Sequence, residues 1–207
     1  MSGINPATVP GMILAGGLSR RMSGQEKAFL DLGGKTLLAR TLASLQEQVT
    51  VWAINANGDA SRFTACGIQV IPDRRPEFLG PLAGIETALA LVTAPWVFVV
   101  PIDLPFLPGN LVQELCVAAK DATRPVTVAS GGRLHPTVGL WPRQLLPQVT
   151  QALDAGRLAM GEWFAHHPHR VVEFPCREDT PDPFFNINTP DDLVMAHRWL
   201  ERGFSGS

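Results

Sequence analysis

The chain has 207 residues, of which 45% are apolar and 17% are charged, a balance typical of one globular domain with a full hydrophobic core. Its formal net charge of -2 offers no basic surface, so we expect no nucleic-acid partner. No apolar run reaches the roughly 18 residues of a membrane span. No basic segment precedes a long apolar run near the first residue. We therefore expect neither a membrane partner nor a signal peptide.

The three cysteines, Cys66, Cys116 and Cys176, are odd in number and far apart. This pattern fits neither a disulfide framework nor a zinc site, and it is typical of a reducing compartment. The sequence therefore predicts a cytoplasmic protein without disulfides.

In chain order, the first 124 residues alternate between expected strands and expected helices. A polar lead-in (1–10) comes first, and Thr36 has the residue type and position of a helix cap. The expected strands are 11–15, 49–55, 68–71 and 96–100, with a short strand and turn at 29–35. The expected helices are 36–46, 59–66, 80–92 and 108–120.

The rhythm changes after residue 124. Two segments rich in β-formers, 126–130 and 136–141, flank Gly131-Gly132, a pattern that favours a hairpin. Further elements are then expected as helices 142–156 and 158–166, a strand 171–174, and a last helix from 190 to 202. That last helix follows Thr189-Pro190-Asp191-Asp192, which combines a cap, a proline at the first helical position and acidic residues in the first turn.

Alternating strands and helices predict a mostly parallel sheet covered by helices on both faces. We therefore expect a single α/β domain over residues 1–207, a three-layer, Rossmann-like fold with a β-hairpin insertion. Only a lead-in (1–10) and a tail (203–207) are expected to be flexible.

A glycine-rich loop follows the first expected strand. Adjacent Gly16 and Gly17 let backbone N–H groups converge on an anion. Positive charge follows at Arg20, Arg21 and Lys27, which suits a polyphosphate. We expect Lys27 to return to the phosphates, and one of the two arginines to meet phosphate while the other makes a structural pair.

Polar residues also stand at the carboxyl ends of three other strands. Ligands bind beyond these ends in open α/β sheets, and Asn55, Asp73 and Asp103 lie there. Asp103 follows a fully apolar strand and has the chemistry to hold Mg²⁺, which takes one or two protein carboxylates; the alternative is a cap of the next helix. Asn55 and Asp73 can contact a base or ribose, or simply cap their loops.

Two further segments have both a functional and a structural interpretation. Gly80 and Gly84 bracket the start of a helix, where they either admit a flat base or permit tight packing. Asn186 and Asn188 point to one side of an extended segment. Their carbonyls either complete a Mg²⁺ shell or hold a second substrate, unless they only form a capping turn.

Taken together, these segments resemble the molybdenum cofactor guanylyltransferases of the nucleotidyltransferase superfamily, which have a Rossmann-like, GT-A-type fold. The resemblance spans about 11–200. It rests on the following segments: Leu14-Ala15-Gly16-Gly17, Ser19, Arg21-Met22, Lys27-Ala28, Gly80-Pro81-Leu82-Ala83-Gly84, Asp103-Leu104-Pro105-Phe106, His135-Pro136 and Asn186-Ile187-Asn188-Thr189-Pro190. The loop departs from the family pattern at Ser23 and Glu26, where glycine and aspartate are usual.

The resemblance implies transfer of GMP from GTP to Mo-molybdopterin with release of pyrophosphate. It implies Mg²⁺ on Asp103 and charge stabilisation by Lys27 and Arg21. The expected substrate-binding positions are Leu14, Ala15, Gly16, Gly17, Lys27, Asn55, Asp73, Gly80, Asp103, Asn186 and Asn188.

The expected partners are GTP, Mo-molybdopterin, and other proteins of molybdenum cofactor biosynthesis or molybdoenzyme chaperones, with the chain itself a monomer. No Ser–His or Cys–His pair stands out in the sequence, and an anionic phosphate acceptor needs no general base. Two alternatives stay open. One is a cytidylyl or adenylyl transferase for a related pterin or another phosphorylated acceptor. The other is a GTP-dependent accessory protein without turnover.

Overall fold

A seven-stranded sheet forms the centre of the molecule in the computed structural model, which describes residues 4–16 and 26–204. The strand order is β3-β2-β1-β4-β6-β5-β7. The strands are β1 (Pro10–Leu14), β2 (Thr50–Asn55), β3 (Gln69–Ile71), β4 (Trp96–Pro101), β5 (Val126–Ser130), β6 (Arg133–Pro142) and β7 (Arg170–Phe174). Among the strands of the described residues, only β6 runs antiparallel to its neighbours, so the expectation of a mostly parallel sheet with a hairpin is confirmed.

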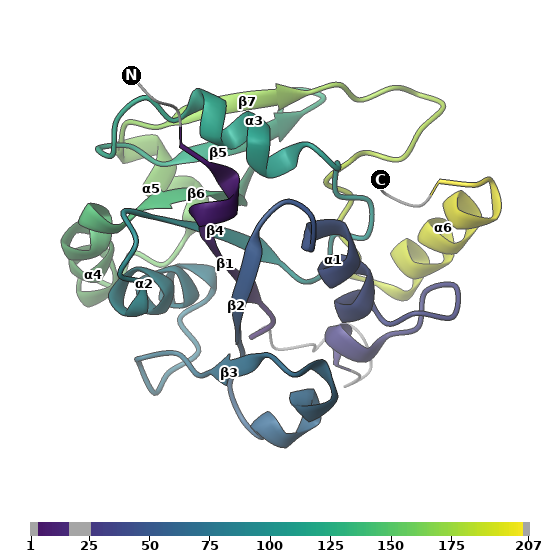
Figure 1. Cartoon of the computed structure of the whole chain (residues 1–207), viewed down its shortest axis with the longest axis horizontal. Helices are drawn as coiled ribbons and strands as arrows, with labels where there is room; N and C mark the ends of the chain where they lie inside the picture. Colours follow the sequence, from purple (N-terminus) through teal and green to yellow (C-terminus); the bar gives the residue numbers. More distant parts are fainter. Residues whose placement is uncertain (1–3, 17–25, 205–207) are drawn as a thin grey trace.

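Helices cover both faces of this sheet, which confirms the three-layer arrangement (Figure 1). The α-helices are α1 (Leu37–Leu45), α2 (Pro81–Leu91), α3 (Leu111–Ala118), α4 (Leu146–Asp154), α5 (Met160–His166) and α6 (Pro190–Glu201). Short 3₁₀ helices lie at Pro6–Thr8, Lys27–Phe29, Ala60–Cys66 and Arg143–Leu145.

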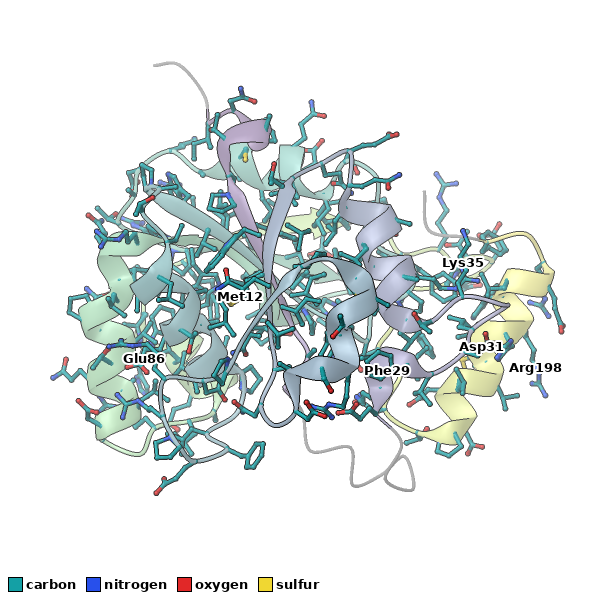
Figure 2. The ribbon with its side chains drawn as sticks, turned by 60° about the horizontal axis from the view of Figure 1, so that its bottom comes forward. Met12, Phe29, Asp31, Lys35, Glu86 and Arg198 are labelled. Carbon is teal, nitrogen blue, oxygen red and sulfur yellow. The ribbon has the colours of Figure 1, made fainter. Side chains whose placement is uncertain are left out.

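The alternation of side chains along β1 explains why the sheet needs two covering layers. Ile13 packs with α1 and α3 on one face, whereas Met12 and Leu14 pack with α2, α4 and α5 on the other. Met12 is completely buried at the centre of the molecule (Figure 2). A strand that is apolar on both faces belongs in the interior of a covered sheet, and both faces of this one are apolar.

Helix ends follow the predicted capping chemistry. The Thr36 side chain accepts a hydrogen bond from the Ala39 amide at 3.1 Å, so α1 begins where the sequence predicted. Thr189 and Asp192 form a reciprocal capping box at the start of α6. These contacts lie within one helical turn, which is why the sequence alone reveals them.

Several expected elements differ in detail. Residues 29–35 hold no regular strand: a 3₁₀ turn and one isolated bridge between Asp31 and Thr36 take its place. The lead-in is structured from residue 5 onward, since Asn5 caps a 3₁₀ helix and Val9 is buried. At the other end, Phe204 packs edge-on against Trp199. Val9 and Phe204 thus pack against the rest of the domain near the two ends of the described residues.

The pairing of β6 sets the shape of the sheet next to the site. β6 pairs with β5, as the hairpin prediction required, and it also separates β5 from β4. Thr127 faces Gly139 whereas Val128 faces His135, so residues 136–138 form a bulge. Thr127 closes this bulge by donating to the carbonyl of Val138 at 2.8 Å. Bulges redirect side chains, and this one brings Thr137 to the cavity described below.

Candidate functional site

A cavity of about 270 Å³ lies at the carboxyl ends of the parallel strands. This is where open α/β sheets bind ligands. Its lining residues are Leu14, Ala15, Gly16, Lys27, Asn55, Asp73, Phe78, Gly80, Pro81, Pro101, Ile102, Asp103 and Thr137. The structure thus brings together eight positions that the sequence predicted: Leu14, Ala15, Gly16, Lys27, Asn55, Asp73, Gly80 and Asp103.

Backbone hydrogen bonds hold the loops of the cavity side by side beyond the ends of their strands. The Ala15 amide donates to the Asn55 carbonyl at 2.8 Å, and the Ile102 amide donates to the Leu14 carbonyl at 3.1 Å. The parallel ladder therefore continues one residue past β1 and β4. As a result, the loops that carry the polar side chains start from fixed positions.

Two asparagine amides fix the Asp73 carboxylate. Asn55 donates from Nδ2 to Oδ1 of Asp73 at 3.0 Å, and Asn57 donates from Nδ2 to Oδ2 at 2.7 Å. Asn57 also accepts the Asp73 backbone N–H at 2.8 Å. Asn57 was not predicted, although its place two residues after Asn55 puts it at the same strand end. The pair of amides presents Asp73 to the cavity in one orientation.

Helix α2 presses closely against Asn55. A Cβ at Gly84 would lie 2.5 Å from Oδ1 of Asn55 and 2.7 Å from Cδ2 of Leu14, closer than side chains approach in proteins. Of the two interpretations left open for Gly84, the structure therefore supports tight packing. At Gly80 φ is +78°, so a left-handed backbone turn, which favours glycine, begins α2 at the cavity.

Lys27, Asp103 and Asn188 form a polar wall beside the cavity. The Lys27 ammonium donates to Oδ2 of Asp103 at 2.7 Å and to Oδ1 of Asn188 at 2.6 Å. The Ile187 amide donates to the Asp103 carbonyl at 3.0 Å and so fixes the late segment against the β4 loop. Three segments far apart in the sequence therefore meet at one ammonium group.

The same wall has unused hydrogen-bonding capacity. Asp103 is only 8% exposed, and its Oδ1 is buried without a hydrogen-bond partner among the described residues. A buried carboxylate oxygen without a partner is costly unless a ligand or cation satisfies it. Hard oxygen donors of this kind suit Mg²⁺, which takes few protein ligands and fills its shell with water and substrate phosphates. Asp103 and the Asn188 carbonyl thus fit a Mg²⁺ site.

Two predicted positions are absent from the described lining of the cavity, and two others lie outside the described residues. Asn186 and Asn188 are absent from the described lining, although Asn188 reaches Lys27, and Oδ1 of Asn186 is buried without a described partner. Gly17 and Arg21 lie outside the described residues, as does Ser23. Glu26, the other departure from the family pattern, forms an ion pair with Arg62 on the 3₁₀ helix Ala60–Cys66.

Other lining residues were missed as site residues. Phe78, Pro101, Ile102 and Thr137 are apolar or small, and residues of these types carry no signal of a binding site in a sequence. Thr137 arrives through the β6 bulge, whose position depends on how β5 and β6 pair. Pro81 was noticed only as part of a motif.

The fold and the site define the class of protein as an α/β nucleotidyltransferase. One cavity lies at an edge of a mostly parallel sheet, beside a glycine-containing loop after β1 and carboxylates that follow β3 and β4. Residues 11–171 match the family model described as MobA-like NTP transferase domain, and the chain therefore belongs to this family.

Known proteins of this family and fold are similar to the chain over most of its length. A molybdenum cofactor guanylyltransferase from Rhodopseudomonas palustris is 41% identical over 201 residues, covering 94% of each chain. The structure of molybdopterin-guanine dinucleotide biosynthesis protein A from Archaeoglobus fulgidus has a TM-score of 0.75 at 23% identity, covering 94% of this chain and 100% of that chain.

The same fold occurs with another nucleotide. A 2-C-methyl-D-erythritol 4-phosphate cytidylyltransferase from Thermus thermophilus has a TM-score of 0.68 at 24% identity, covering 94% of this chain and 98% of that chain. Fold similarity alone therefore does not select the base. Within residues 4–16 and 26–204, no helix combines the length and apolarity needed to cross a membrane.

Proposed function

We propose that this chain transfers GMP from GTP to Mo-molybdopterin, producing Mo-molybdopterin guanine dinucleotide and pyrophosphate. The observation that carries the proposal is the meeting of Lys27, Asp103 and Asn188 beside a cavity that contains the other predicted nucleotide-binding residues. The choice of guanine and of the pterin acceptor is supported by the name of a relative that is 41% identical over 94% of the chain.

The nucleotide would lie along the carboxyl ends of the strands. Its base and ribose would meet Asp73 and the Gly80 turn, because these line the cavity together with Asn55. Its triphosphate would meet the loop after β1 and Lys27. Gly17 and Arg21 belong to that loop in the sequence, and we propose phosphate contacts for both.

Group transfer would proceed by in-line displacement. An anionic phosphate oxygen of molybdopterin attacks the α-phosphorus of GTP, a new P–O bond forms, and the bond to the bridging oxygen of pyrophosphate breaks. The attacking oxygen carries no proton, so the reaction needs no general base. Fixed positive charges stabilise the charge that develops on the phosphates, and positioning supplies most of the remaining acceleration.

Lys27 has two roles in this scheme. Before nucleotide binds, its ammonium neutralises Asp103 and also bonds Asn188. When the triphosphate binds, Lys27 would turn to the phosphate oxygens, and Asp103 and Asn188 would be the residues free to hold Mg²⁺. A Mg²⁺ ion held there would supply positive charge that offsets the charge of the phosphates.

The cellular setting is also part of the proposal. We place the protein in the cytoplasm as a monomer, exchanging its cofactor with other biosynthesis proteins or molybdoenzyme chaperones. All three cysteines are free, and burial raises the pKa of the Cys116 thiol to about 11, so that this thiol is inert at neutral pH.

Pyrophosphate release tests the activity and the choice of base. GTP, CTP, ATP and UTP are each incubated with the protein and Mg²⁺, with and without Mo-molybdopterin. We expect release only with the pterin and fastest with GTP. Faster release from CTP or ATP would replace the guanylyl assignment by the first alternative. Tight GTP binding without any release would identify an accessory protein.

A further inference from the structure

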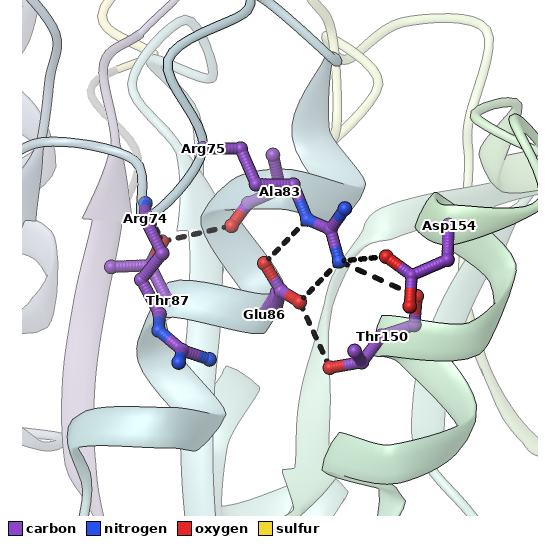
Figure 3. Close-up of polar contacts among 7 residues, drawn as sticks. All are labelled: Arg74, Arg75, Ala83, Glu86, Thr87, Thr150 and Asp154. Carbon is purple, nitrogen blue, oxygen red and sulfur yellow. Dashed lines mark hydrogen bonds and ion pairs between the residues drawn. The ribbon is translucent and has the colours of Figure 1, made fainter.

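The loop between β3 and α2 (72–80) holds no helix or strand, and it carries Asp73, Phe78 and Gly80 to the cavity. Three consecutive residues at its start are held by three different groups. Asn57 accepts the Asp73 amide, and Thr87 accepts the Arg74 amide at 3.1 Å. The third, Arg75, reaches Glu86 of α2 and Asp154 of α4 (Figure 3).

Arg75 and Glu86 form a two-pronged ion pair. Nε of Arg75 donates to Oε2 of Glu86 at 3.0 Å, and Nη2 donates to Oε1 at 2.9 Å. Thr150 of α4 donates to the same Oε1 at 2.8 Å, and Asp154 of α4 accepts from Nη2 of Arg75 at 2.8 Å. One guanidinium therefore joins the loop to two helices (Figure 3).

Glu86 is a buried charge whose main compensation comes from Arg75. The residue is 2% exposed, and hydrogen bonds from Arg75 lower the pKa of its carboxyl despite the opposing effect of burial. A parallel, two-bond contact between guanidinium and carboxylate is geometrically specific, and lysine cannot reproduce it. Removing one partner of such a pair leaves an uncompensated charge in the interior.

The position of the pair in the chain gives it a specific consequence. Arg75 is near the start of the loop, and Glu86 lies in α2, whose first turn begins at the Gly80 and Pro81 edge of the cavity. The contact therefore joins the two ends of the segment 75–86. This segment contains Phe78 and Gly80, the loop residues after Asp73 that line the described cavity. Neither Arg75 nor Glu86 lines the described cavity itself.

We propose that Arg75 is a positioning residue for the nucleotide: through Glu86 it holds the 73–80 loop in the conformation that receives the base and ribose of a nucleoside triphosphate. This inference rests on the proposed function. Contacts to the base and ribose act equally on the bound substrate and the transition state. Loosening the loop therefore raises KM for the nucleotide and leaves kcat and the KM of the acceptor unchanged.

Arg75→Lys tests the proposal, with Arg170→Lys as the matched control. Arg170 pairs with Asp121 at 2.8 Å and is similarly half-buried, but it is the first residue of β7, at the opposite edge of the sheet from the cavity. Binding of a fluorescent GTP analogue is titrated without acceptor, and KM and kcat are measured by pyrophosphate release. We expect Arg75→Lys to weaken nucleotide binding about tenfold with kcat within about twofold, and Arg170→Lys to change neither.

A milder variant covers the case in which Arg75→Lys does not fold. Thr150→Val keeps the side-chain shape and removes one hydrogen bond to Glu86, so we expect a rise in nucleotide KM of about two- to threefold. Wild-type nucleotide affinity in both variants, or equal losses in Arg75→Lys and Arg170→Lys, would overturn the inference. Failure of the wild-type protein to bind the GTP analogue would instead overturn the proposed function.

Discussion

The two halves of the sheet place polar residues at the same edge and use them differently. In the half formed by β3, β2, β1 and β4, Asn55, Asp73 and Asp103 line a cavity. In the half formed by β6, β5 and β7, Ser130 and His135 lie at strand positions near the same edge, and they bond to each other at 2.8 Å and, through Ser130, to Asp182 at 2.7 Å.

In the second network, Ser130 bonds both His135 and Asp182. A carboxylate only accepts, so the Ser130 hydroxyl donates to Asp182 and accepts from Nε2–H of His135. Asp182 also accepts the Phe184 amide at 2.8 Å, and Phe184 packs against the His135 ring. The sequence did not predict this Ser–His pair. Its contacts show a structural link between the β5–β6 hairpin and the late segment, and no group in it is oriented as a base toward a nucleophile.

The difference teaches that a place at the strand ends is not enough to identify a functional residue. Oδ1 of Asp103 is buried and has no described partner, whereas the Ser130 hydroxyl uses its hydrogen and accepts a second bond. A buried carboxylate oxygen that lines the cavity and has no described partner therefore distinguishes the β3-β2-β1-β4 half, called the reactive half below, from the Ser130–His135–Asp182 network of the other, structural half. The following changes test that distinction, in order of decreasing expected effect.

Asp103→Asn should have the largest effect. The amide keeps the size of the side chain but removes the charge that holds Lys27 and would hold Mg²⁺. Turnover should fall by about 10³-fold, the scale seen when a major electrostatic contribution to the transition state is removed. Pyrophosphate release measures this, with Asp121→Asn as the distant control. Wild-type turnover by Asp103→Asn in Mg²⁺ would show that the unpartnered carboxylate of Asp103 does not mark a functional residue.

Gly84→Ala should displace two cavity-lining residues, Asn55 and Leu14, from the side of α2. The added methyl would meet Asn55 and Leu14, so we expect destabilisation of about 1–3 kcal/mol and a raised KM for GTP. Gly161→Ala is the matched control, since its Cβ would meet nothing within 4 Å and alanine favours a helix. Chemical unfolding and kinetics of both variants measure the contrast. A stabilised Gly84→Ala would contradict the close approach of α2.

Ser130→Ala should affect stability and leave the affinity for GTP unchanged. It removes the shared partner of His135 and Asp182 in a residue that is 1% exposed, which should cost about 1–3 kcal/mol. Ser61→Ala, which removes an exposed hydroxyl bonded to Asp59, should change stability by less than about 0.5 kcal/mol. Urea unfolding gives both values. A rise in the KM for GTP comparable to that of Gly84→Ala would remove the distinction between the halves.

Acid pH should produce the smallest effect, through His135. Burial lowers the pKa of His135 below the value of about 6.5 in an unfolded chain. Between the folded pKa and about pH 6.5 the unfolded state therefore binds more protons than the folded state, so the free energy of unfolding falls as pH drops from about 6.5 to the folded pKa and levels off below it. Urea unfolding at a series of pH values should show that the free energy of unfolding decreases below about pH 6.5. The decrease should be smaller in His135→Gln. An unchanged slope in the variant would exclude His135 as its source.

Local signals let the sequence by itself determine most elements and half of the site. Apolar runs identified the buried strands, and the convergence of parallel strand ends then brought Asn55, Asp73 and Asp103 together in the prediction. Thr36 and Thr189 marked two helix starts, because a cap bonds an amide within one turn. These inferences succeed because each depends on residues close in sequence or on a general rule of sheet topology.

Only the tertiary structure decided how distant side chains meet. Nothing in the sequence pairs Lys27 with Asn188, 161 positions away, or Arg75 with Glu86. Glu86 is a charged residue of α2, a type usually exposed to solvent. In the fold it is buried, and Thr150 of α4 bonds its carboxylate. Such contacts depend on strand register, the β6 bulge and the packing of one helix on another. These are properties of the whole fold, and they determine which polar groups are saturated and which remain free to bind a substrate.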